Sequence, residues 1–155
     1  MLFRSEWYRS PLVVAIQQDH PLARRPSVSL KQLKDEPFVT YPREAGTGLY
    51  WQILDICAHA GFRPRVAREV LEPSTIIGLV AAGVGVAIVP AGIQCIRLNG
   101  AIYKPLTDIS AYSALYLAQR QGDPNTHLRA IREMLATTGL PQPRQKKRAA
   151  AASRR

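Results

Sequence analysis

The chain has 155 residues, of which 46% are hydrophobic, and carries a formal net charge of +10. This length fits a single domain, and the hydrophobic share is enough to build a core. No run of about eighteen apolar residues is present and the first ten residues lack a signal-peptide core, so we expect a cytoplasmic protein without a membrane span.

Positive charge is concentrated at the C-terminal end. Residues 141–155 contain six basic side chains and no acidic one, and +10 less these six leaves +4 on residues 1–140. The segment has no apolar periodicity, so we expect a disordered basic tail that contacts phosphates only non-specifically. The net charge therefore does not indicate a specific nucleic-acid site.

The first predicted element is a buried strand at residues 11–17, where β-branched and apolar residues follow one another. A polar turn follows, and Ser29 is placed to cap a short helix that ends before Pro37. A second strand is predicted at residues 37–41, and the segment 43–48 is predicted to be a loop with two glycines.

Two helix–strand pairs are predicted in the middle of the chain. Apolar residues at helical spacing predict a helix at 49–60, and a strand follows at 65–70. Pro73 opens a second helix, which is apolar nearly all round and is therefore predicted to be buried. With a strand at 86–90, this alternation indicates an α/β fold with a parallel sheet.

The last third of the chain is predicted to contain a short helix at 91–96, strands at 101–105 and 112–118, and a final helix at 125–137. The predicted buried face of that final helix is formed by Leu128, Ile131, Met134 and Leu135.

Cys57 and Cys95 both lie in predicted helices, at a spacing that matches no disulfide framework and no metal site. We interpret them as two buried free thiols.

Three segments resemble one known family. They are the strand that runs into the turn at residues 19–23, the sequence GFRPRVAREV at 61–70, and LVAAGVGVAIVPAG at 79–92. In this order they resemble the effector-binding domain of LysR-type transcriptional regulators, over about residues 11–138. Within that family, YPREAGTG and the stretch from QCIRLNG to YKPLTD are most similar to regulators of aromatic-compound (catechol and benzoate) degradation.

The resemblance implies a periplasmic-binding-protein type 2 fold, in which two Rossmann-like lobes enclose the effector. The implied division is residues 1–10 as the remnant of a preceding lobe, 11–17 as a crossover strand, 18–100 as a complete effector-binding lobe, 101–140 as a crossover with a partial second lobe, and 141–155 as the tail.

The chain is thus expected to be N-terminally truncated, without the family's DNA-binding domain and without the opening half of one lobe. Apolar faces of strands 11–17 and 112–118 and of helix 125–137 should then be exposed and promote association. The resemblance also implies a homo-oligomer that forms through helix 49–60 and strand 65–70.

Ligands of open parallel sheets bind at the carboxyl ends of the strands, and two such ends carry candidate residues. One end leads through an arginine and a glycine-rich loop into a helix N-terminus, and these groups together suit a carboxylate. The alternative interpretation of this end is a capped turn with a solvated arginine, without a ligand. At the other end, the alternative is that Ser74 or Thr75 only caps a helix. The predicted ligand-binding residues are Tyr41, Pro42, Arg43, Gly46, Thr47, Gly48, Leu71 and Thr75.

Enzyme chemistry finds no support in the sequence. No serine or cysteine has a base at a known motif spacing, no dinucleotide or Walker motif is present, and no cofactor or metal is predicted. His20 is expected to be structural or exposed rather than catalytic, and His59 and His127 are expected to be solvated.

The sequence therefore predicts the effector-sensing domain of a LysR-type regulator that binds a small carboxylate, such as an aromatic acid or a muconate. DNA would be contacted only through a domain absent from this chain. Two alternatives stay open: a solute-binding protein of a transport system, which shares the fold, and a nucleic-acid-binding protein that works through the basic tail.

Overall fold

The computed structural model describes residues 2–45, 48–107, 112–120 and 124–137. The chain divides into two compact units, which we call the central unit (Arg9–Ser113) and the terminal unit (Met1–Tyr8 with Ala114–Arg155). Strands and α-helices are β1 (Leu2–Gln17), β2 (Pro37–Thr40), α1 (Leu49–His59), β3 (Arg65–Glu69), α2 (Pro73–Ala81), β4 (Ala87–Pro90), β5 (Ala101–Pro105), β6 (Tyr112–Arg120) and α3 (Thr126–Thr137).

The sheet of the central unit is mixed. β1 lies between β4 and β5 and is antiparallel to both, with Val14 opposite Ile88 on one side and Lys104 on the other. β2 pairs in parallel with β3. Val86, just before β4, also bridges β2 in parallel, through a backbone bond of 2.8 Å to the Pro37 carbonyl. The predicted parallel arrangement of residues 38–90 is confirmed.

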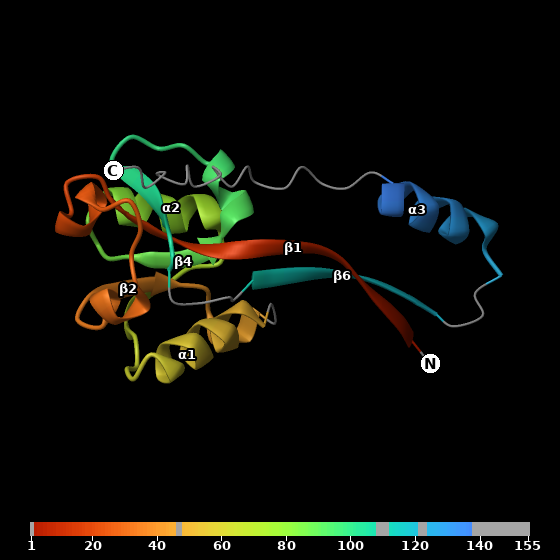
Figure 1. The fold of residues 1–155 in the computed structure, drawn as a ribbon, viewed down its shortest axis with the longest axis horizontal. Coiled ribbons are helices and arrows are strands. Elements are labelled where there is room, and N and C mark those ends of the chain that lie inside the picture. Colours follow the sequence, from red (N-terminus) through yellow and green to blue (C-terminus); the bar gives the residue numbers. More distant parts are fainter. Residues whose placement is uncertain (1, 46–47, 108–111, 121–123, 138–155) are drawn as a thin grey trace, which may run out of the picture. The chain divides into compact units, whose positions relative to one another are not determined.

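Helices α1 and α2 cover opposite faces of this sheet (Figure 1). α1 begins after Gly48, whose φ of 69° lies in the left-handed region that favours glycine, and it buries Leu49, Ile53 and Cys57 at four-residue spacing. α2 has Pro73 in its first turn, as predicted, and buries Ile76, Ile77 and Val80. The predicted burial of this helix is confirmed for these three residues, whereas Ser74 and Thr75 in its first turn are exposed.

All buried hydrophobic side chains of the described residues lie between Leu12 and Ala91, within the central unit. Residues 12–16 of β1 are all buried, so the expectation that strand 11–17 exposes an apolar face is wrong. The reason is that this part of β1 lies in the hydrophobic core of the central unit, together with buried residues of α1 and α2. The short helix predicted after Ser29 is a 3-10 turn, Leu30–Leu33, capped by a bond of 2.9 Å from the Ser29 amide to the Gln32 side chain.

The two cysteines differ in environment. Cys57 is buried in α1, whereas Cys95 is exposed at the end of the 3-10 helix Ala91–Cys95. The prediction of two buried thiols is therefore wrong for Cys95, because that short helix lies on the surface. Burial raises the pKa of the Cys57 thiol to about 12.

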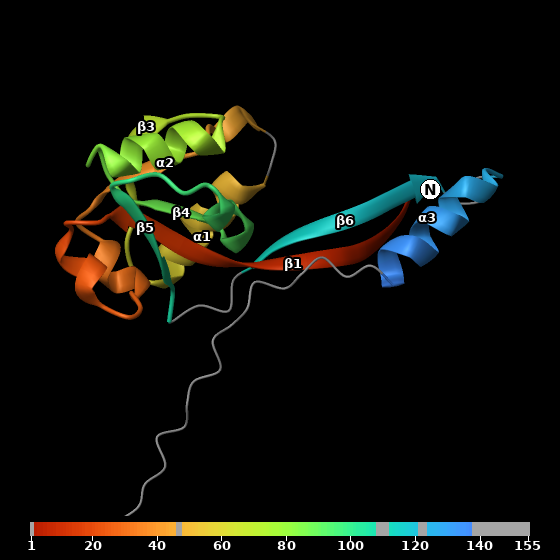
Figure 2. The same ribbon diagram turned by 90° about the horizontal axis from the view of Figure 1, so that it is seen from above.

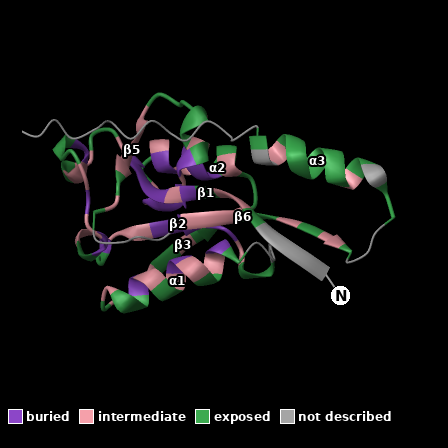
Figure 3. Ribbon diagram, turned by 45° about the vertical axis from the view of Figure 1, so that its right-hand side comes forward, coloured by how far each residue is buried: buried purple, intermediate pink, exposed green. Residues whose placement is uncertain are grey.

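The terminal unit contains the start of β1, β6 and α3, and β6 runs alongside the N-terminal half of β1 (Figure 2). The Trp7 indole N–H donates to the Leu135 carbonyl at 3.0 Å, which ties α3 to β1. Of the predicted buried face of α3, Leu128 and Leu135 are only half-buried, and Ile131 and Met134 are exposed. The expected exposure of apolar residues is confirmed for β6, at Leu115 and Tyr116, and for α3 (Figure 3). The predicted tail at 141–155 lies outside the described residues.

Candidate ligand-binding site

The candidate site begins at the carboxyl end of β2. The Thr40 carbonyl accepts a bond of 3.0 Å from the Val70 amide, which places the ends of β2 and β3 side by side. The two predicted groups of site residues, one after each strand, therefore start from the same edge of the sheet. This is the edge at which ligands of parallel sheets bind.

Tyr41 and Pro42, two of the predicted site residues, follow β2 at this edge. Tyr41 is buried, with 7% of its surface exposed, and belongs to the hydrophobic core; Pro42 is half-buried. Burial raises the pKa of the Tyr41 phenol, because the low-dielectric surroundings disfavour the phenolate. The phenol is therefore neutral near neutral pH and places no negative charge at the site.

Arg43 is the exposed cation of the site. It begins a short 3-10 helix, Arg43–Ala45, and its guanidinium carbon lies 4.9 Å from the centroid of the Trp51 ring. Trp51 in turn meets Tyr50 edge-on, with ring centroids 5.3 Å apart. A cation–π contact of this kind holds the charge near the first turn of α1 without using the N–H donors of the guanidinium.

The N-terminus of α1 supplies further donors. The Gly48 carbonyl accepts the first helical bond, from the Gln52 amide at 3.0 Å. The amides that precede Gln52 in the first turn have no acceptor within the helix, so they suit an anion. Gly46 and Thr47 lie outside the described residues, so their contact with a ligand stays a prediction from the sequence.

The second strand end is more open than the first. Leu71 is 58% exposed, and Thr75 is exposed on the first turn of α2. The alternative that Ser74 or Thr75 caps α2 is wrong, because the N-cap is Glu72, and Pro73 begins the helix. Leu71 and Thr75 therefore offer a surface beside the site rather than an enclosing wall.

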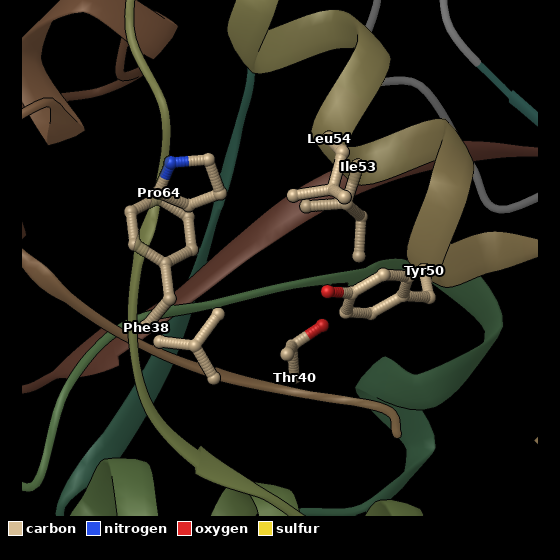
Figure 4. Close-up of a pocket in the computed structure, with 7 residues that line it drawn as sticks. Phe38, Thr40, Tyr50, Ile53, Leu54 and Pro64 are labelled. Carbon is tan, nitrogen blue, oxygen red and sulfur yellow. The ribbon is translucent and has the colours of Figure 1, made fainter. Parts of the chain in front are cut away.

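An apolar hollow lies between α1 and the sheet, and none of its lining residues is among the predicted site residues. Its lining residues are Phe38, Thr40, Tyr50, Ile53, Leu54, Pro64 and Val66. The Thr40 and Tyr50 hydroxyls point toward each other across it (Figure 4). The sequence feature that could have indicated this hollow is the alternation of side chains along β2, which places Phe38 and Thr40 on the face toward α1.

The histidines have no part in this site. The His20 Nδ1 atom accepts from the Leu22 amide at 3.2 Å, and its Nε2 atom lies 3.2 Å from a Glu36 carboxylate oxygen, so the structural role predicted for it is confirmed. His59 and His127 are exposed, as predicted. Within the described part of the chain, no cluster of side chains could hold a metal ion, and no helix has the length and apolar character to cross a membrane.

Comparison with known proteins decides the family. Residues 2–139 match the LysR substrate binding domain. The chain belongs to the LysR family. YnfL of Escherichia coli (strain K12), an HTH-type transcriptional regulator, is 43% identical over 107 residues, which is 69% of this chain and 36% of YnfL. BenM of Acinetobacter baylyi is 33% identical over 138 residues, 85% of this chain and 45% of BenM.

Solved LysR structures share the fold. The effector binding domain of a BenM variant superimposes with a TM-score of 0.79 at 31% identity, over 86% of this chain and 63% of that one. The BenM effector binding domain with its effector benzoate gives a TM-score of 0.76, also at 31% identity, over 92% of this chain and 67% of that one. The predicted periplasmic-binding-protein type 2 fold is thus confirmed, and this LysR chain spans less than half of YnfL or BenM.

Proposed function

We propose that this chain is the effector-sensing domain of a cytoplasmic LysR-type transcriptional regulator and that it binds a small carboxylate. The LysR match covers most of the chain, and the named relatives are transcriptional regulators rather than enzymes or transport receptors. The similar BenM domain has benzoate as its effector, which favours a carboxylate here. DNA contact would come from a helix-turn-helix domain elsewhere in the regulator.

The observation that carries the proposal is the bond between the Thr40 carbonyl and the Val70 amide. It brings the residues that follow β2, among them Tyr41 and Arg43, to the same edge of the sheet as Leu71, which follows β3. We place the carboxylate against Arg43 and the amides that follow Gly48, with Tyr41 and Pro42 as an apolar wall. Gly46 and Thr47 would contribute from the loop between them, and Leu71 and Thr75 from the neighbouring strand end.

Replacing Arg43 by alanine should weaken benzoate binding about tenfold or more, because a hydrogen bond to a charged group contributes roughly 1.5–3 kcal/mol. The dissociation constant is measured by following amide chemical shifts of the full chain during a benzoate titration, which detects weak binding.

The matched control is Arg63→Ala. Arg63 is also exposed and lies in the turn between α1 and β3, away from the carboxyl ends of the strands. This variant should keep the parent affinity within about twofold, since it removes the same charge from another place. Equal affinities for the parent and both variants would show that Arg43 is a solvated surface charge.

We further propose that the chain forms a homo-oligomer through residues 49–60 and 65–70. Among the described strands, β3 pairs with β2 alone, so it presents a free edge. Val66 on β3 is 37% exposed, which leaves an apolar side chain on the strand with the free edge, and Trp51 on α1 is 51% exposed. A free strand edge with apolar neighbours favours pairing with another chain.

The variant Val66→Lys should therefore raise the dissociation constant of the oligomer about tenfold or more, since it places a charge in an apolar contact. Leu98→Lys is the control, because Leu98 is similarly exposed, at 41%, but lies outside both segments. Sedimentation equilibrium measures both. Unchanged association of the Val66 variant would exclude this contact.

A further inference from the structure

The first turn of α1 begins without a capping side chain. Its N-cap is Gly48, so no N-cap side chain bonds to the turn. The helical hydrogen bonds start where the Gln52 amide donates to the Gly48 carbonyl, and the amides of residues 49–51 are therefore the donors that the turn offers. The directions of these amides depend on how the turn is rotated about the helix axis. A contact other than a cap has to fix that rotation.

Apolar burial holds one side of this turn. Leu49 and Ile53 are buried and lie on the same face of α1, one turn apart. Apolar contacts of this kind are non-directional, so they tolerate a small rotation of the helix. A directional contact on another side of the helix sets the angle more closely. Gln52 precedes Ile53 and projects about 100° away from it around the axis, which places it to make such a contact.

Gln52 bonds to the start of β6. Its side-chain Nε2 donates to the Tyr112 carbonyl at 2.8 Å, and both residues are half-buried. Tyr112 is the first residue of β6 and lies sixty residues further along the chain. The Arg9 guanidinium carbon lies 4.2 Å from the centroid of the Tyr112 ring, so a cation–π contact also holds Tyr112 from β1. The first turn of α1 is thus tied through Tyr112 to two strands.

These contacts lie where the chain passes between the two units. The central unit begins at Arg9 and ends at Ser113, and it contains all three of the contacting residues, Arg9, Gln52 and Tyr112. The start of α1 is therefore tied to the two segments through which the chain enters and leaves its own unit, in addition to the sheet that it covers.

We propose that Gln52 is a positioning residue, which anchors the first turn of α1 to Tyr112 and so sets the directions of the amides of residues 49–51. This inference rests on the proposed carboxylate site, because those amides are the donors that face the ligand there. Tyr112 and Arg9 then influence the affinity for a carboxylate without contacting it. Arg43 differs from Gln52 in presenting its charge to the ligand itself.

The anchor is tested first without a ligand, through residual dipolar couplings, which report the directions of N–H bonds. Tyr112→Leu removes the ring that Arg9 contacts and should change the couplings of residues 49–51. Gln52→Met keeps the length of the side chain but removes its donor. In that background Tyr112→Leu should leave the same couplings unchanged, because the connection is already broken.

Gln18→Met is the matched control background. Gln18 is exposed and follows the opposite end of β1 from Arg9, so this variant makes the same chemical change away from the anchor. Tyr112→Leu should change the couplings of residues 49–51 in this background as it does in the parent.

Benzoate affinity is the second readout. Gln52→Met should raise the dissociation constant about fivefold, the effect of one hydrogen bond of ordinary strength, while Gln18→Met should change it by less than about twofold. Tyr112→Leu should weaken binding in the parent and add no further loss to Gln52→Met, because both substitutions act through one contact.

Three results would overturn the proposal. The couplings of residues 49–51 stay unchanged in Tyr112→Leu, they change equally with and without Gln52→Met, or Gln52→Met binds benzoate as tightly as the parent while Arg43→Ala binds it more weakly. A parent chain that binds no benzoate would instead contradict the carboxylate site. The dipolar couplings require no ligand, so they decide on the anchor in that case as well.

Discussion

Replacing Gly85 by alanine should lower the free energy of unfolding by more than about 3 kcal/mol, a loss that few single substitutions cause. A Cβ atom at this position would lie 2.4 Å from the Pro37 carbonyl oxygen and 2.9 Å from its carbon. Both are backbone atoms, so no side chain can rotate away. The same Pro37 oxygen accepts the Val86 amide at 2.8 Å, and separating them would break the bridge that joins β4 to β2.

Gly78→Ala is the matched control. Gly78 lies within α2, and a Cβ added there meets nothing within 4 Å. Alanine should stabilise a helix interior by roughly 0.5–1 kcal/mol relative to glycine. Urea unfolding of the full chain measures both variants. A Gly85→Ala protein as stable as the parent would mean that β2 and β4 are not joined as described.

The two cysteines should differ about a hundredfold or more in their rate of reaction with a thiol reagent in the native protein. Cys57 is fully buried, and its thiol pKa is raised to about 12, so both access and the thiolate fraction are low. Cys95 is exposed. Reaction with Ellman's reagent near neutral pH should therefore release one equivalent quickly and the second only after denaturant is added.

Serine variants assign the two phases. Cys95→Ser should remove the fast phase, and Cys57→Ser should leave it in place. The raised pKa has a further consequence, since above the ordinary thiol pKa the unfolded chain loses this proton while the folded chain keeps it. Stability should then fall with rising pH toward about 12. Rapid reaction of Cys57 without denaturant would contradict its burial in α1.

The alternation of strands and helices between residues 38 and 90 could be predicted because each element there has a local signal. Strand β1 could not be predicted in full. Its first half, residues 2–9, mixes apolar residues such as Leu2 and Trp7 with charged ones and has no regular alternation, and β6 pairs with β1 from more than a hundred residues away. The burial of Leu12–Ile16 likewise depends on distant segments, since the core around them includes residues of α1 and α2.

The location of the candidate site could be predicted from the sequence, but most of its side-chain contacts could not. Strand ends, an arginine and a helix start can be recognised in the sequence, and the bond from Val70 to Thr40 joins the two ends. The contact of Arg43 with Trp51 depends on how α1 turns after Gly48, which no local pattern encodes. The exposure of Cys95 likewise depends on whether packing covers a short helix.

The proposed carboxylate site is tested most directly by locating where a carboxylate binds on this chain. Titration of the isotope-labelled full chain with benzoate, followed through its amide chemical shifts, locates the contact. We expect saturable shifts at Tyr41, Arg43, Gly48 and the first turn of α1, with little change around His20 and Glu36. Shifts confined to the basic residues 141–155, or no saturable shift at all, would contradict the proposed site.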